Sequence, residues 1–100
     1  MRAVLPLALL AALFSPLAQA DAKLAQAKNC MACHATNQKI LGPAFKDVAV
    51  KYAKDKKAVD MLSEKIIKGG KGVWGEMPMP ANAVTPDEAK KLAAWVLTVK

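Results

Sequence analysis

The chain has 100 residues and carries 15 Lys and Arg against 8 Asp and Glu, which gives a formal net charge of +7. Although 54% of its residues are hydrophobic, only 5% are aromatic. A chain of this length forms at most one small domain, and it is too short for most enzymes that are built around large clefts.

The first 20 residues have the layout of a cleaved secretory signal. Arg2 is followed by an apolar run over residues 3–14, and Ala18-Gln19-Ala20 is the small-residue pattern at which such signals are cut. Cleavage after Ala20 would leave residues 21–100 as one exported domain with 14 Lys, no Arg and 8 acidic residues. An uncleaved membrane anchor is the alternative, but prolines interrupt the run, which is short for a bilayer span.

Apolar spacing predicts four short helices and no strand of useful length, so the expected fold class is all-α. The first helix is expected over residues 22–29, with Asp21 as a possible N-cap. The second is expected over residues 45–53, where apolar side chains recur at i, i+3, i+4 and i+7.

The third and fourth helices have clear boundary signals. Residues 58–68 have an apolar face, and Gly69 follows them as a natural helix terminator. Thr85-Pro86-Asp87-Glu88 is a capping box with Pro in the first helical position, so a helix is predicted over residues 86–99. The Gly- and Pro-rich residues 70–84 between these helices are long for a connection in a compact domain, which indicates a binding loop.

Cys30, Cys33 and His34 form a C-x-x-C-H motif, and the chain holds no other Cys or His. On a helical turn these positions share one face, so all three side chains can reach the same planar ligand. The motif is the attachment signature of c-type haem, with two thiols for covalent bonds and an imidazole for the iron. A redox dithiol or a plain disulfide is the alternative. Haem would also supply the apolar bulk that so small a core lacks.

Methionine is the remaining candidate for the axial position opposite His34, because no second His exists. Met31 lies between the cysteines and Met61 lies within a predicted helix, where core packing is the expected use. Met77 and Met79 lie in the loop, and prolines on both sides of Met79 stiffen the segment that would present its sulfur. Met79 is favoured, Met77 is the runner-up, and an open sixth position is the alternative.

Four segments of the chain after residue 20 match a known pattern. They are Cys30-Met31-Ala32-Cys33-His34, Leu41-Gly42-Pro43-Ala44-Phe45, Gly72-Val73-Trp74-Gly75 with Pro78-Met79-Pro80-Ala81-Asn82, and Ala94-Trp95-Val96-Leu97. With them the chain resembles the small bacterial class I cytochromes c of the cytochrome c-551/c-552 type, also called cytochrome c8. The resemblance implies a cytochrome c fold with four short helices around one covalent haem c, His34 and Met79 as axial ligands, and a soluble periplasmic electron carrier. Ala81 departs from the family, because relatives often carry a second consecutive Pro there.

The resemblance also implies three contacts around the haem. Pro43 would accept a hydrogen bond from Nδ1 of His34 through its carbonyl oxygen, and such a bond fixes an imidazole and raises its basicity. Trp74 would donate its indole N–H to a haem propionate, with a simple aromatic lid as the alternative. Asn82 would form a hydrogen bond near the methionine sulfur. Lys65, where some relatives place an Arg toward a propionate, has no assigned contact.

The basic charge favours acidic partners. A positive surface around an exposed haem edge would steer a monomeric carrier toward redox proteins with acidic docking patches. The resemblance suggests a nitrite reductase or a haem-copper terminal oxidase as acceptor. Solvated helix faces, such as residues 54–57, are the other explanation of the lysines. Nucleic acid is not expected, because Arg, the commonest reader of bases, is absent after residue 20.

Two other interpretations have less support. Residues 70–75 match G-x-G-x-x-G, but they follow a predicted helix and lead into Pro78, so a dinucleotide site is not expected. These glycines would instead let the backbone approach the haem edge. A haem enzyme or gas-binding protein with an open sixth position would need a distal His or Arg to split an O–O bond, and residues 21–100 supply neither beyond His34.

Overall fold

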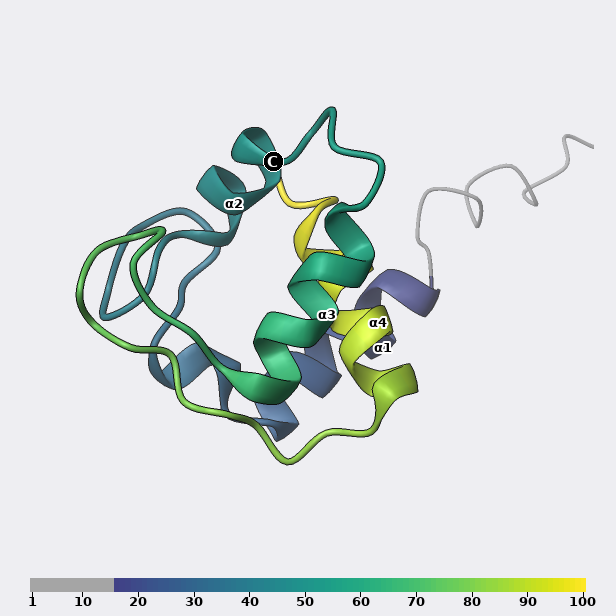
Figure 1. Ribbon diagram of the computed structural model, residues 1–100. Helices are drawn as coiled ribbons and strands as arrows, with labels where there is room; N and C mark the ends of the chain where they lie inside the picture. Colours follow the sequence, from purple (N-terminus) through teal and green to yellow (C-terminus); the bar gives the residue numbers. More distant parts are fainter. Residues whose placement is uncertain (1–15) are drawn as a thin grey trace, which may run out of the picture.

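The computed structural model describes residues 16–100, which form four α-helices (Figure 1). Within these residues no strand occurs, and the β pairing is limited to two isolated antiparallel bridges, His34 with Lys39 and Gly70 with Met79. The expected all-α class is therefore confirmed. The elements in chain order are α1 (Pro16–Ala27), the short 3-10 helix η2 (Cys30–Ala32), α2 (Phe45–Lys51), α3 (Ala58–Lys68) and α4 (Pro86–Val96).

The first helix differs from the prediction at both ends. In the uncleaved chain it begins at Pro16 rather than at residue 22, so there Asp21 lies inside the helix and is not its N-cap. Pro is favourable in the first helical position, and the Leu-Ala-Gln-Ala that follows contains good helix formers. At the other end, Asn29 adopts a left-handed conformation with φ 63° and separates α1 from η2. Most of the expected signal, residues 1–15, lies outside the described residues.

The other three helices begin at the expected residues. α3 matches its predicted range at both ends, and Gly69 follows it with a φ of 76°. The capping box of α4 is confirmed in both directions. The Thr85 hydroxyl accepts a hydrogen bond from the Glu88 amide at 3.1 Å, and the Glu88 carboxylate accepts one from the Thr85 amide at 2.9 Å.

Two helices are shorter than predicted, because α2 ends at Lys51 and α4 ends at Val96. The apolar residues beyond these ends, Tyr52 and Val99, still pack against the core, but they do so from turns. Apolar spacing therefore predicted burial correctly and overestimated helix length.

α4 is the centre of packing, since α3 lies along it and both α1 and α2 contact it (Figure 1). Phe45, Val48 and Val96 form the main buried cluster. Most other buried apolar positions are alanines, whose small side chains let helices approach closely. No helix within residues 16–100 is long and apolar enough to span a bilayer. The buried alanines are Ala25, Ala44, Ala49, Ala58, Ala89 and Ala93.

Candidate functional site

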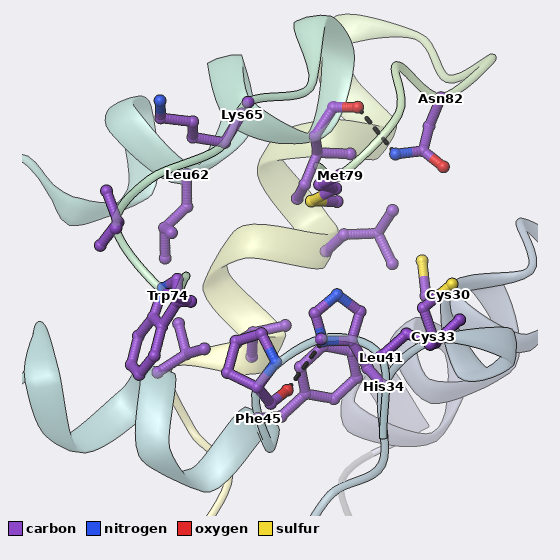
Figure 2. Close-up of a pocket in the computed structure, with 18 of the residues that line it drawn as sticks. Cys30, Cys33, His34, Leu41, Phe45, Leu62, Lys65, Trp74, Met79 and Asn82 are labelled. Atoms are coloured by element: carbon purple, nitrogen blue, oxygen red, sulfur yellow. Dashed lines mark hydrogen bonds between the residues drawn. The ribbon is translucent and has the colours of Figure 1, made fainter. Parts of the chain in front are cut away.

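An apolar pocket of about 420 Å³ lies between α3, α4 and the loop segments on either side of them. Its volume falls within the usual range of small-molecule sites. Figure 2 shows His34 and Met79 facing one another across the pocket, with Cys30 and Cys33 at one end and Trp74 at the other. Every site residue that the sequence singled out lines this pocket: Cys30, Cys33, His34, Pro43, Trp74, Met79 and Asn82.

Cys30, Cys33 and His34 lie on one tight turn. The amides of Cys33 and His34 both donate to the carbonyl oxygen of Cys30, at 3.2 and 3.0 Å. The two thiols are free and half-buried. Burial raises the pKa of the Cys30 thiol, although a backbone hydrogen bond opposes the shift. Because the thiolate is the nucleophile in thiol redox chemistry, this environment does not resemble that of an activated dithiol.

The imidazole of His34 is oriented by the core. Its Nδ1 donates to the carbonyl oxygen of Pro43 at 2.8 Å, which leaves the lone pair of Nε2 directed at the pocket (Figure 2). Phe45 stacks on the imidazole with ring centroids 4.7 Å apart and planes 22° apart. Trp95 packs edge-on against Phe45 at 5.4 Å. His34 is thus held in one orientation by a hydrogen bond and by the buried ring of Phe45, which in turn packs against the partly buried Trp95.

Gly42 lies so close to the imidazole that only glycine fits. A Cβ at this position would stand 2.5 Å from Cε1 of His34. The Gly42 amide donates to the carbonyl oxygen of Cys33 at 2.8 Å, which folds the chain back onto the motif. Gly42 belongs to a segment that resembles the family, but no local pattern in the sequence indicates this contact.

Met79 is held through its main chain. Its N–H donates to the Gly70 carbonyl at 2.8 Å, and its carbonyl accepts from the Gly70 N–H at 3.0 Å. Gly69 comes just before with φ 76°, and a Cβ there would overlap the Met79 carbonyl oxygen. The two glycines after α3 therefore let the backbone of Met79 lie directly on the end of the helix. Residues 70–82 are called the methionine loop below.

Asn82 fastens the far end of the methionine loop to α3. Its side-chain nitrogen donates to the carbonyl oxygens of Ile66 at 3.0 Å and Pro80 at 3.3 Å, and its main-chain N–H also donates to Ile66, at 3.2 Å. Both hydrogens of the amide nitrogen are thus used on main-chain carbonyls. In the structure Asn82 therefore supports the loop that carries Met79, and its hydrogen bond near the methionine sulfur stays a prediction.

The remaining methionines lie in different surroundings. Met77 is 62% exposed at the rim of the pocket. Met61 of α3 also lines the pocket, and Met31 packs against the main buried cluster. Met79 is the methionine that Figure 2 shows opposite His34.

Trp74 stands at the end of the pocket away from the cysteines. Its side chain is 39% exposed, and Nζ of Lys51 lies 5.7 Å from its ring centroid. Lys65 lies at the same end, with its side chain running along Gly70 (Figure 2). The sequence did not indicate the contact of Lys51, because it exists only where α2 and the methionine loop meet in space.

Gly72 and Gly75 serve the turn inside the methionine loop. Their φ angles are 98° and 119°, and the Gly72 amide donates to the Gly75 carbonyl at 2.9 Å. No protein atom lies within 4 Å of a Cβ placed at either position. These two glycines are required by backbone conformation, whereas Gly69 and Gly42 are required by the close approach of other protein atoms.

The residues around the pocket fit a haem c. Two thiols on one turn, an imidazole with a free Nε2 and a thioether on the opposite wall make up the donor set that cytochromes c use. The apolar walls suit a flat apolar ring system.

Comparisons with known proteins point the same way. Residues 18–100 match the Cytochrome c family. The chain is 57% identical over 81 residues to cytochrome c-552 of Hydrogenobacter thermophilus, covering 81% of this chain and 83% of that one. It is 53% identical over 73 residues to cytochrome c-551 of Pseudomonas aeruginosa, covering 73% and 70%. The crystal structure of wild-type Nitrosomonas europaea cytochrome c552 is similar with a TM-score of 0.77 and 50% identity, over 79% of this chain and 99% of that chain.

Proposed function

This chain belongs to the cytochrome c family, and we propose on that premise that it carries single electrons in the periplasm with its haem iron ligated by His34 and Met79. As a member of the family it binds one covalent haem c and is an electron carrier rather than an enzyme. The ligation rests on one observation. His34 and Met79 face one another across the pocket that also receives Cys30 and Cys33.

When bound, the haem supplies an iron that is reduced and oxidised by one electron. Cys30 and Cys33 would fix it through thioether bonds at one end of the pocket. Ligation by Met and His raises the reduction potential of haem iron, and the apolar walls act in the same direction because they disfavour the extra charge of the oxidised state. The hydrogen bond from His34 to Pro43 holds the imidazole and keeps it basic. Trp74 would donate its indole N–H to a propionate.

The visible spectrum of the oxidised protein tests the ligation. Met79→Ala should abolish the weak far-red band of sulfur bound to ferric haem and let the reduced protein bind carbon monoxide. Met77→Leu is the matched control, because it removes an exposed thioether two residues away and should leave the band intact. If only Met77→Leu removes the band, Met77 is the ligand. A wild-type protein without the band would contradict methionine ligation altogether.

Export and docking complete the proposal. The signal pattern over residues 1–20 supports cleavage after Ala20 and release of residues 21–100 into the periplasm as a monomer. Lys65 and Lys71 line the pocket near Trp74, so positive charge lies at one rim of the haem site. This arrangement supports docking to acidic patches on redox partners such as a nitrite reductase or a terminal oxidase.

The salt dependence of electron transfer tests the docking. Second-order rates with an acidic redox protein should fall as ionic strength rises, because salt screens attraction between exposed charges. Rates that do not change with salt would contradict steering by these lysines while leaving the ligation untouched.

A further inference from the structure

The tip of the methionine loop has few attachments of its own. The base of the loop is fastened by the bridge between Gly70 and Met79, and the turn from Gly72 to Gly75 is internal to the loop. Between these points the side chains are exposed, including Val73 at 53%. The contact that reaches from this tip to another element is made by Trp74.

That contact is with Lys51, the last residue of α2. Nζ of Lys51 lies 5.7 Å from the ring centroid of Trp74 and 5.8 Å from that of Tyr52, so one ammonium serves two aromatic rings. Both distances are within the range in which a cation is attracted to the face of an aromatic ring, and Trp is the strongest partner. A cation is also favourable at the C-terminal end of a helix.

The two rings differ in how firmly they are held. Tyr52 is half-buried and packs against the cluster around Phe45, so it is part of the framework. Trp74 is 39% exposed and belongs to the loop tip. Both rings line the pocket. The ammonium of Lys51 therefore lies between a ring that packs against the core and a ring on the exposed loop tip.

We propose that Lys51 is a positioning residue that holds Trp74 against the end of α2 and keeps the Trp74 end of the pocket closed. This contact between the Lys51 ammonium and the Trp74 ring is called the clasp below. Its ammonium takes part in neither of the ion pairs formed among residues 16–100, which join Lys28 to Glu88 and Lys68 to Glu64. The clasp depends on the charge of Lys51 and on the aromatic face of Trp74. It goes beyond the proposed ligation, because it concerns the opening of the loop tip and not which atom binds the iron.

Hydrogen exchange of the holoprotein tests the clasp directly. Lys51→Met keeps the length of the side chain and removes its charge, so it should speed exchange of the hydrogen-bonded amides of Gly72 and Met79 in this loop by about two- to fivefold. Lys51→Arg should restore slow exchange, because a guanidinium also binds aromatic faces. Lys46→Met removes a charge from the exposed face of the same helix and should leave this segment unchanged.

A second variant separates a clasp from a general charge effect. In a Trp74→Leu background the aromatic partner is gone, so adding Lys51→Met should have no further effect on exchange. Entry of imidazole to the ferric haem gives a spectroscopic readout and should quicken about two- to fivefold in Lys51→Met alone.

The proposal is overturned if Lys51→Met leaves both rates unchanged, or if it accelerates them equally with and without Trp74. These results can be told apart from a failure of the proposed ligation, because loop exchange is measured whichever sulfur binds the iron.

Discussion

His34 and Met79 stand on opposite walls of one pocket, but the two walls are built differently. The His34 wall is continuous with the hydrophobic core, because Phe45 stacks on the imidazole and is itself buried against Trp95. The Met79 wall is a loop that is held mainly by main-chain hydrogen bonds to Gly70 and Ile66.

The difference separates two kinds of stability. Core packing holds the His34 wall, so a change there lowers the free energy of unfolding of the whole molecule. Main-chain bonds at the end of α3 hold the Met79 wall, so a change there releases the loop while most of the core stays intact. With His34 and Met79 as the proposed axial ligands, one ligand is tied to global unfolding and the other to local opening.

The largest predicted effect is on the His34 wall, where Phe45→Ala should lower the free energy of unfolding of the whole molecule. Phe45 is only 5% exposed, and its removal leaves a cavity beneath the imidazole. We expect a loss of about 3–5 kcal/mol in the free energy of unfolding of the holoprotein, measured by guanidinium denaturation. The far-red band should persist at neutral pH. Phe45→Leu, which fills most of the space, should lose much less, and equal losses in the two variants would contradict the cavity explanation.

On the Met79 wall, Gly69→Ala should loosen the methionine loop. The substitution forces an alanine to adopt φ 76° and places its Cβ against the Met79 carbonyl oxygen. Backbone strain of this kind costs about 1–3 kcal/mol. We expect a weaker far-red band and faster binding of imidazole.

Gly72→Ala is the matched control for Gly69→Ala. It has a similar backbone penalty at φ 98°, but no protein atom lies within 4 Å of its Cβ. It should therefore leave the band intact. If the two variants weaken the band equally, the close approach of Met79 to Gly69 has no role in holding the ligand.

Asn82→Ala should also loosen the Met79 wall, but with a smaller effect than Gly69→Ala. It removes the side-chain hydrogen bonds to the Ile66 and Pro80 carbonyls, although the Ile66 carbonyl still accepts from the main chain of residue 82. Losing these bonds should make displacement of Met79 by imidazole about two- to tenfold easier, measured by titration of the ferric protein. Asn37→Ala, at an exposed position outside the methionine loop, should change nothing. Normal affinity for imidazole in Asn82→Ala would show that the main-chain bonds suffice.

The smallest predicted effect concerns the pH dependence of stability and involves Glu88, which does not line the pocket. Its hydrogen bond from the Thr85 amide, helped by Lys28, holds the pKa of the Glu88 carboxyl below its usual range. A lowered pKa in the folded state contributes stability that is present above the unfolded pKa, about 4.3, and is lost as pH falls through the folded value. Denaturation curves should show a shallower acid decline for Glu88→Gln than for wild type.

Asp87→Asn provides the comparison for Glu88→Gln, because it removes a neighbouring charge that takes no part in the capping box. It should keep the acid decline of the wild type. The far-red band should not change in either variant, since neither residue lines the pocket. An acid decline that is the same in Glu88→Gln as in wild type would remove this carboxylate as a source of pH dependence.

Local signals predicted much of this fold. The capping box of Thr85 and Glu88 and the glycine after α3 place helix ends through interactions within a few residues, and the structure has both. The longer α1 has the same origin, because in the uncleaved chain the helix-forming residues before Asp21 extend the helix to Pro16. Cleavage after Ala20 would make Asp21 the first residue. The left-handed turn at Asn29 had a usable signal, since Asn tolerates this conformation better than most residues.

Spacing along the sequence predicts Cys30, Cys33 and His34 as a haem site, and the flanking prolines favour Met79; the structure places all four around one pocket. The contacts that support these residues were not predictable. The bridge from Gly70 to Met79 and the contact of Lys51 with Trp74 join residues that meet only after the chain has folded. Spacing along the sequence carries no information on such contacts.

The abundance of buried alanine affects how stability depends on temperature. Six of the ten buried apolar residues within residues 16–100 are alanines, so the helices themselves remove little large apolar surface from water. The pocket walls add apolar surface that is dehydrated only when a flat apolar group fills the pocket. The heat capacity of unfolding follows the apolar area that becomes exposed. The holoprotein should therefore have a larger heat-capacity increment, and a more strongly curved stability profile, than its polypeptide alone would provide.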